Sequence, residues 1–191
     1  MKLNHRLALS CAVALLALSP LSACSSDDTG KKLDAWAKGV CDQTAAQTKK
    51  INDANTSLTK VDSGGKPETV QASDSAAFQQ ISDAYKALAG IYSQAGAAPG
   101  DGGAQFQQKA VTSFTTLSTQ YAGLKKQVDA LDTTDQNKFA QGLQGVSDSF
   151  KQTSADGEQA LSSVRQGDQG KALAKQPGCQ SGSGSASPTS S

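Results

Sequence analysis

The sequence is poor in the residues on which most enzyme active sites depend. Its one histidine, His5, lies close to the start. The rest of the chain therefore cannot form a Ser-His-Asp triad, a Cys-His pair or the Glu-x-x-His ligands of ferritin-like metal sites. The glycine run at residues 100–103 lacks the preceding strand and the Lys-Ser/Thr of a phosphate-binding loop. Carboxylates such as Asp83, Asp129 and Asp148 are scattered and predicted to serve solubility. We expect no catalytic site, no metal and no cofactor.

Aromatic residues and strong charge are also scarce. Aromatic residues make up 5% of the chain and charged residues 18%. Beyond Cys24 no apolar run approaches the roughly 20 residues that a membrane-spanning helix needs. No basic patch stands out, so a nucleic acid partner is not expected. The length of 191 residues suits a single domain.

The most informative stretch lies at the start of the chain. Lys2 and Arg6 precede residues 7–21, which are almost all apolar or small, as in a secretory signal peptide. The stretch ends in Leu21-Ser22-Ala23-Cys24, which resembles the lipobox of bacterial lipoproteins. This resemblance implies that residues 1–23 are a signal peptide and that the Cys24 thiol receives a diacylglyceryl group before cleavage makes Cys24 the first residue. Two acyl chains are enough for stable anchoring. An ordinary secretory signal with a chance cysteine is the alternative.

The four cysteines of the sequence are expected to have different fates. Cys11 lies inside the signal peptide and is removed with it, and Cys24 is the lipidation site. Cys41 and Cys179 remain, and an even pair in an exported protein predicts a disulfide. On the chain-entropy account, closing so long a loop stabilises the fold by about 4–5 kcal/mol.

Hydrophobic residues repeat at steps of three and four along four segments, which predicts four long helices. The first covers about residues 31–61, and the second runs from an N-cap at Ser73 or Asp74 to Ala95. The third covers about residues 106–131, and the fourth runs from the turn at residues 132–135 to about residue 164. The cleanest stripe, in the third segment, consists of Phe106, Ala110, Phe114, Leu117, Tyr121, Leu124, Val128 and Leu131.

These segments predict an all-α fold, an antiparallel up-down-up-down four-helix bundle with one disulfide. Short loops place consecutive helices side by side and antiparallel. Four helices return the chain to the pole where it began, so the segment after the fourth helix can bring Cys179 to Cys41. Residues 24–30 are predicted to be a tether, residues 31–180 the bundle domain, and the Ser- and Gly-rich residues 181–191 a disordered tail.

Three groups of residues have side chains suited to binding. Tyr85, Tyr92 and Tyr121 fall on the core stripes, and we expect rim positions with hydroxyls in water rather than polar sites inside the bundle. Trp36 is expected to pack in the core rather than against lipid. Paired lysines are expected to be solvated helix surface rather than contacts for anionic lipid or wall polymer; they are Lys31-Lys32, Lys49-Lys50 and Lys125-Lys126.

Together with the lipobox, two short motifs resemble the uncharacterised small secreted lipoproteins of high-GC Gram-positive bacteria. They are Leu-Asp-Ala-Trp-Ala-Lys-Gly-Val-Cys at residues 33–41 and Pro177-Gly178-Cys179-Gln180. The resemblance implies an exported all-helical domain with a disulfide between its N- and C-terminal parts and no agreed activity.

These observations lead to one expected function and one alternative. We expect a lipid-anchored protein on the outer face of the cell membrane, acting as a non-enzymatic helical binding or interaction module. Its expected partners are the membrane, through the lipid on Cys24, and an unidentified envelope protein. The alternative is a carrier that holds a small apolar ligand in a bundle core rich in Ala and Gly.

Overall fold

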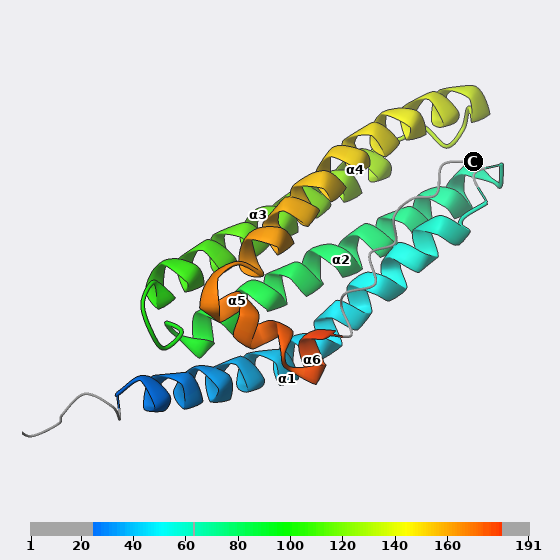
Figure 1. Ribbon diagram of the computed structural model, residues 1–191. Coiled ribbons are helices and arrows are strands. Elements are labelled where there is room, and N and C mark those ends of the chain that lie inside the picture. Colours follow the sequence, from blue (N-terminus) through cyan, green and yellow to red (C-terminus); the bar gives the residue numbers. More distant parts are fainter. Residues whose placement is uncertain (1–24, 63, 181–191) are drawn as a thin grey trace, which may run out of the picture.

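The structure of the protein is a computed structural model that describes residues 25–62 and 64–180, with side chains from residue 28 onward. Over this range it contains helices and no strands (Figure 1). The four long helices are α1 (Ser25–Lys60), α2 (Pro67–Ala95), α3 (Gly103–Asp129) and α4 (Gln136–Val164). Two short helices follow, α5 (Gly167–Ala174) and α6 (Pro177–Gln180).

The long helices form the predicted antiparallel four-helix bundle (Figure 1). α1 packs against α2, α2 against α3, and α3 against α4, while α5 and α6 double back onto α1. Within the described residues, α1 and α4 share no extended interface. Consecutive long helices therefore share extended interfaces, but the first and last long helices do not.

Two helix starts differ from the sequence-based prediction. α2 begins at Pro67 rather than at Ser73 or Asp74, because proline fits the first position of a helix, where its missing N–H would have no acceptor. Asp74 consequently lies two turns inside α2. α1 begins at Ser25, so most of the predicted tether at residues 24–30 is helical, and Lys32 Nζ lies 3.3 Å from Asp28 Oδ2 one turn earlier.

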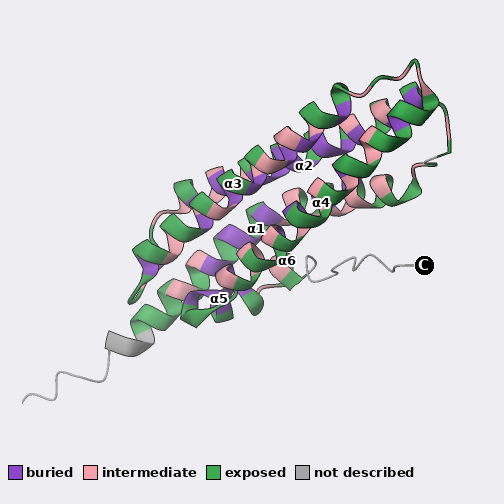
Figure 2. Cartoon of the chain, turned by 90° about the horizontal axis from the view of Figure 1, so that it is seen from above, coloured by how far each residue is buried: buried purple, intermediate pink, exposed green. Residues whose placement is uncertain are grey.

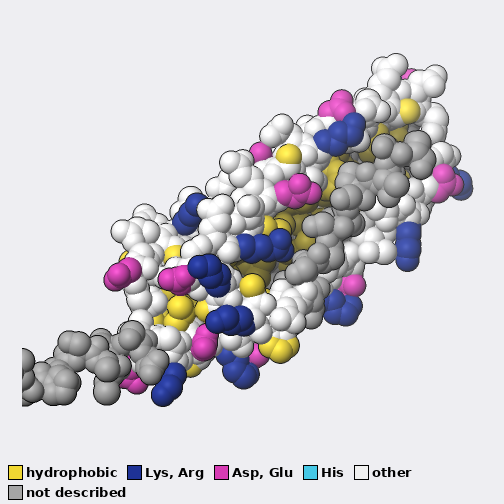
Figure 3. Space-filling view, in the orientation of Figure 1, with side chains coloured by type: hydrophobic (Ala, Val, Ile, Leu, Met, Phe, Trp, Pro, Cys, Tyr) yellow, Lys and Arg dark blue, Asp and Glu magenta, His cyan; other side chains and the backbone are white. Residues whose placement is uncertain are grey.

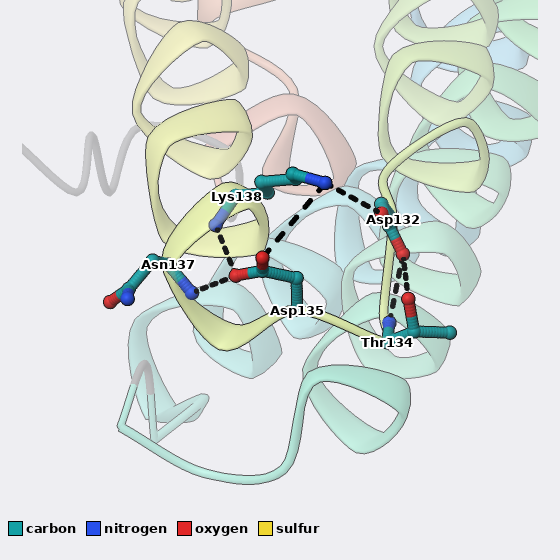
Figure 4. Close-up of polar contacts among 5 residues, drawn as sticks. All are labelled: Asp132, Thr134, Asp135, Asn137 and Lys138. Atoms are coloured by element: carbon teal, nitrogen blue, oxygen red, sulfur yellow. Dashed lines mark hydrogen bonds and ion pairs between the residues drawn. The ribbon is translucent and has the colours of Figure 1, made fainter.

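The turn between α3 and α4 is fixed by two aspartates (Figure 4). Asp135 is the N-cap of α4, and its Oδ1 accepts hydrogen bonds from the backbone N–H groups of Asn137 at 2.9 Å and Lys138 at 3.1 Å. Asp132 Oδ1 accepts from the Thr134 N–H at 2.9 Å. Lys138 Nζ lies 4.0 Å from Asp132 and 3.9 Å from Asp135. These contacts hold the short link that makes α4 antiparallel to α3.

Buried residues form a continuous core along the bundle (Figure 2). The predicted stripe of α3 is confirmed, since its members from Ala110 to Val128 are buried and those at its two ends, Phe106 and Leu131, are partly exposed. α4 contributes Phe139 and Val146 to the buried set. The periodic apolar stripes thus define the inner faces of the long helices.

Candidate functional site

Of the predicted sites, only the disulfide falls within the described residues. Cys24, the predicted signal peptide at residues 1–23 and the predicted tail at residues 181–191 lie outside them. α1 begins at the residue that follows Cys24. The part of the bundle nearest the expected anchor is therefore the N-terminal half of α1, where α5 and α6 pack.

The predicted disulfide between Cys41 and Cys179 is present. It joins α1 to α6 with a Cα–Cα distance of 5.0 Å, and Cys41 is fully buried. Gly178 makes this approach feasible, because a Cβ at its position would lie 2.6 Å from the carbonyl oxygen of Cys41. The disulfide therefore fixes the C-terminal helices against α1, as the four-helix topology predicted.

The three tyrosines lie inside the bundle, so the prediction of rim positions is wrong. Tyr85, Tyr92 and Tyr121 are each at most 6% exposed. Burial raises the pKa of all three phenols, and Ser154 hydrogen bonds to Tyr121, which acts in the opposite direction. Gly157 of α4 leaves room beside one of these rings, since a Cβ at its position would lie 3.8 Å from the Tyr85 hydroxyl oxygen.

The aromatic rings form one connected row through the core. Trp36 lies 5.9 Å from Phe106 and 6.4 Å from Tyr92 by ring centroids, both edge to face. Core packing of Trp36 is therefore confirmed, although its buried Nε1 has no hydrogen-bond acceptor among the described residues. The row continues through Phe114, Tyr85, Tyr121, Phe78 and Phe150.

The paired lysines are distributed around the surface. Lys31, Lys32, Lys49, Lys50 and Lys126 are exposed. Several lysines pair with an aspartate one turn away on their own helix, as Lys49 does with Asp53 at 2.6 Å and Lys125 does with Asp129. Such exposed pairs contribute little to stability, and their arrangement is that of a solvated helix surface.

One buried charge, Asp74 two turns into α2, was not predicted from the sequence. It is 8% exposed, and no hydrogen bond or ion pair from the described residues reaches its carboxylate. Burial raises its pKa from 3.8 to about 6. A signal is present in the sequence, because Asp74 falls four residues before Phe78 on the apolar stripe. The signal is ambiguous because aspartate is also a common helix N-cap.

Hydrogen bonds on either side of α2 define where Asp74 points. Gln71 donates to the Val128 carbonyl and Ser82 to the Ser118 carbonyl, so one side of α2 faces α3. On the opposite side, Gln80 donates to the Lys50 carbonyl of α1 at 3.0 Å. At 3.6 residues per turn, Asp74 lies on the face between these two sides. It therefore faces the space between α1 and α3.

Contacts between helices also show which residues lie at the same height along the bundle as Asp74. Phe78, one turn further along α2, has its ring 5.7 Å from that of Phe150 in α4. Because α2 and α4 run in the same direction, Asp74 is level with Val146, which is buried. The Gln80–Lys50 contact likewise places Asp74 level with the turn of α1 that contains Ala54 and Leu58. Apolar residues of α1 and α4 thus lie at the level of Asp74.

Part of the apolar core reaches the surface beside α4. Figure 3 shows hydrophobic side chains along the side of α4 that faces α2 and α1. Leu58 of α1 and Phe150 of α4 are partly buried and pack against the core. Within the described residues no extended α1–α4 interface covers them.

The described surface has a shallow depression between α3 and α4 that is lined mainly by residues with polar side chains. Its lining includes Lys109, Gln120, Asp156 and Leu117, and it is open to solvent. Gln120 Nε2 donates to Asp156 Oδ2 at 2.6 Å, and the second oxygen of Asp156 accepts from Gln152 at 2.9 Å. The carboxylate is thus already satisfied by this chain.

Neither a membrane-spanning helix nor a metal site is found in the part of the chain that the structure describes. Residues 25–62 and 64–180 contain no helix that is both long and apolar enough to cross a membrane. The same residues contain no group of three or more His, Cys, Asp or Glu side chains placed to hold a metal ion. No protein family model, curated protein or solved structure matches this chain.

Proposed function

We propose that the protein is a lipoprotein anchored through Cys24 to the outer face of the cell membrane, where it acts as a non-enzymatic helical interaction module. The disulfide between Cys41 and Cys179 supports export, because disulfides persist in oxidising compartments. The lipobox at residues 21–24 supports the anchor. Its diacylglyceryl group would supply the two chains that stable membrane attachment requires.

The start of α1 supports a short distance between bundle and membrane. Because α1 begins at Ser25, no long flexible linker separates the expected lipid from the folded domain. The pole formed by α5, α6 and the N-terminal half of α1 would lie next to the bilayer. The opposite pole, with the α1–α2 and α3–α4 turns, would face outward and be available to an envelope partner.

The alternative function is a carrier of a small apolar ligand. The centre of the core is occupied by the connected row of rings from Trp36 to Phe150. Hydrophobic side chains reach the surface along the side of α4 that faces α2 and α1 (Figure 3). A carried ligand would therefore bind at that side of α4 rather than at the centre of the core.

Metabolic labelling tests the anchor. Cells that produce the wild-type chain, Cys24→Ser or Cys11→Ser are grown with tritiated palmitate, and the protein is followed in membrane and soluble fractions. Label and membrane retention are expected for the wild type and for the matched control Cys11→Ser, but not for Cys24→Ser. Label that persists in Cys24→Ser would refute lipidation at this residue.

Crosslinking on intact cells tests the interaction module. An amine-reactive crosslinker applied to the anchored wild type is expected to trap the same partner in independent cultures. The released Cys24→Ser chain is the matched control, and it is expected to lose that product because it no longer concentrates at the membrane. Absence of any reproducible product from the anchored chain would contradict the proposal.

A further inference from the structure

We propose that Asp101, in the loop between α2 and α3, is a modification site at which the chain forms isoaspartate spontaneously and thereby loosens α5. Such a site is independent of the anchored interaction module and of lipid at Cys24. Three observations support it: an exposed Asp-Gly pair, a glycine N–H without an acceptor, and a second Asp-Gly pair that the fold protects.

The sequence contains two Asp-Gly pairs, Asp101-Gly102 and Asp156-Gly157. In such a pair the backbone nitrogen of glycine attacks the Cγ carbon of the preceding carboxyl group, and glycine favours the attack because it has no Cβ. A C–N bond forms, the carboxyl OH and the nitrogen's proton leave as water, and a cyclic succinimide results. Water then opens the ring. Opening at the side-chain carbonyl restores aspartate, whereas opening at the backbone carbonyl yields isoaspartate.

The first pair is exposed in the loop between α2 and α3. The Asp101 carboxylate makes no hydrogen bond or ion pair with the described residues. A hydrogen bond from the Gly103 N–H to the Gly100 carbonyl closes the turn at 3.3 Å, which leaves the Gly102 N–H without an acceptor among the described residues. Gly102 has a φ of 74°, a value that glycine adopts readily. The attacking nitrogen and the carboxyl group are therefore both available.

The second pair lies inside α4, where the fold holds both of its reacting groups. In an α-helix the N–H of each residue donates to the carbonyl four residues earlier, so the Gly157 nitrogen is engaged. The Asp156 carboxylate accepts hydrogen bonds from Gln120 at 2.6 Å and from Gln152 at 2.9 Å. Ring closure at this pair requires local opening of the helix and loss of both contacts. The same dipeptide is thus reactive in the loop and protected in the helix.

Isoaspartate at residue 101 changes the contact that joins α5 to the loop. α5 lies at the same end of the bundle as this loop (Figure 1), and the buried Gln169 of α5 donates from Nε2 to the Asp101 carbonyl at 2.9 Å. In isoaspartate that carbonyl becomes a free carboxylate, and the backbone is longer by a methylene group. The loop has little slack, because a Cβ at Gly103 would collide with the Ala98 carbonyl. The modification therefore disturbs the packing of α5 on the loop.

The experiment uses the chain from residue 24 onward with Cys24→Ser, because this chain contains every described helix and the disulfide but carries no lipid. The folded chain is stored warm at neutral pH for several weeks, and a second sample is stored unfolded in guanidinium chloride. Trypsin then places the two Asp-Gly pairs on separate peptides, residues 87–109 and 152–165. Isoaspartate has the mass of aspartate, so chromatography and electron-transfer fragmentation of these peptides measure it.

In the folded chain isoaspartate is expected to accumulate at residue 101 at least about tenfold faster than at residue 156, because the helix must first open at the second pair. In the unfolded chain the two pairs should react at similar rates. Asp101→Glu is the matched variant: it keeps the charge, but its longer side chain closes the ring much more slowly, so no isomer should form there. Hydrogen exchange in α5 should become faster as the parent chain is stored and stay constant in Asp101→Glu.

Two outcomes would overturn the proposal. The first is isoaspartate that is absent at residue 101, or equally frequent at residues 101 and 156, in the stored folded chain. The second is hydrogen exchange in α5 that stays unchanged after isoaspartate has accumulated at residue 101, since this would show that the modified loop does not loosen α5.

Discussion

Replacing Asp74 by asparagine is predicted to stabilise the folded protein at neutral pH by about 1–2 kcal/mol. Burial raises the carboxyl pKa from 3.8 to about 6, and each tenfold change in an acid dissociation constant corresponds to about 1.4 kcal/mol. The ionised carboxylate therefore destabilises the fold by up to about 3 kcal/mol above pH 6. Asparagine has nearly the same shape and no charge, but its amide also lacks partners, which costs about 1 kcal/mol or more.

The gain in folding stability from Asp74→Asn should depend on pH in a defined direction. Between pH 3.8 and about 6 the folded state binds more protons at Asp74 than the unfolded state does. Folding stability contributed by this residue is therefore present at low pH and is lost as pH rises through this window. The advantage of Asp74→Asn should be small near pH 4 and fully developed near pH 7.5. An unperturbed aspartate would give no such profile.

Chemical denaturation followed by circular dichroism at several pH values between about 4 and 8 measures the effect. The quantity to compare is the difference in free energy of unfolding between variant and wild type. Other carboxylates change the stability of both proteins in the opposite direction as pH rises, and the difference removes their effect. Hydrogen bonds from Lys125 and Ser75, for example, lower the pKa of Asp129. Asp83→Asn on the same helix is the control and should give a flat difference. A destabilised or pH-independent Asp74→Asn would refute the inferred burial of an unpaired charge.

Three further substitutions test the architecture by denaturation. The double change Cys41→Ser and Cys179→Ser should lower the free energy of unfolding by about 4–5 kcal/mol, and a loss below about 1 kcal/mol would contradict the disulfide's role. Gly178→Ala should destabilise by about 1–3 kcal/mol, and thiol titration should show more free cysteine, because the new Cβ would lie 2.6 Å from the Cys41 carbonyl. Asp135→Ala should cost about 1 kcal/mol by removing the N-cap of α4, whereas Asp135→Asn should cost less.

Much of the architecture could be predicted because it depends on periodicity and on one covalent link. The stripe from Ala110 to Val128 needed only the helical repeat to be interpreted as an inner face. The pairing of Cys41 with Cys179 was predicted because they are the two cysteines left after the predicted signal peptide and the predicted lipid site, and it is confirmed. One prediction used a local repeat and the other a count of cysteines, so neither required knowledge of the tertiary contacts.

The sequence-based predictions were wrong where one residue type is compatible with two different local structures. Pro67 favours a break in a helix, yet at the first helical position proline is favourable. Because of this ambiguity the start of the second helix was predicted at Ser73 or Asp74, and Asp74 was not recognised as a buried charge. Tyr85 and Tyr92 are predicted at the rim because a phenol needs water or a partner, yet both are buried, and each packs against the ring of Phe114. Only the packed structure decides between these alternatives.

The position of Asp74 on α2 is unfavourable for stability. Val70 and Phe78, its neighbours on the same stripe, are both buried, so an apolar residue between them would stabilise the fold more than a carboxylate does. Local departures of this kind concentrate at functional sites. A gain in stability for Asp74→Asn that grows with pH would therefore measure how much stability this carboxylate costs the fold.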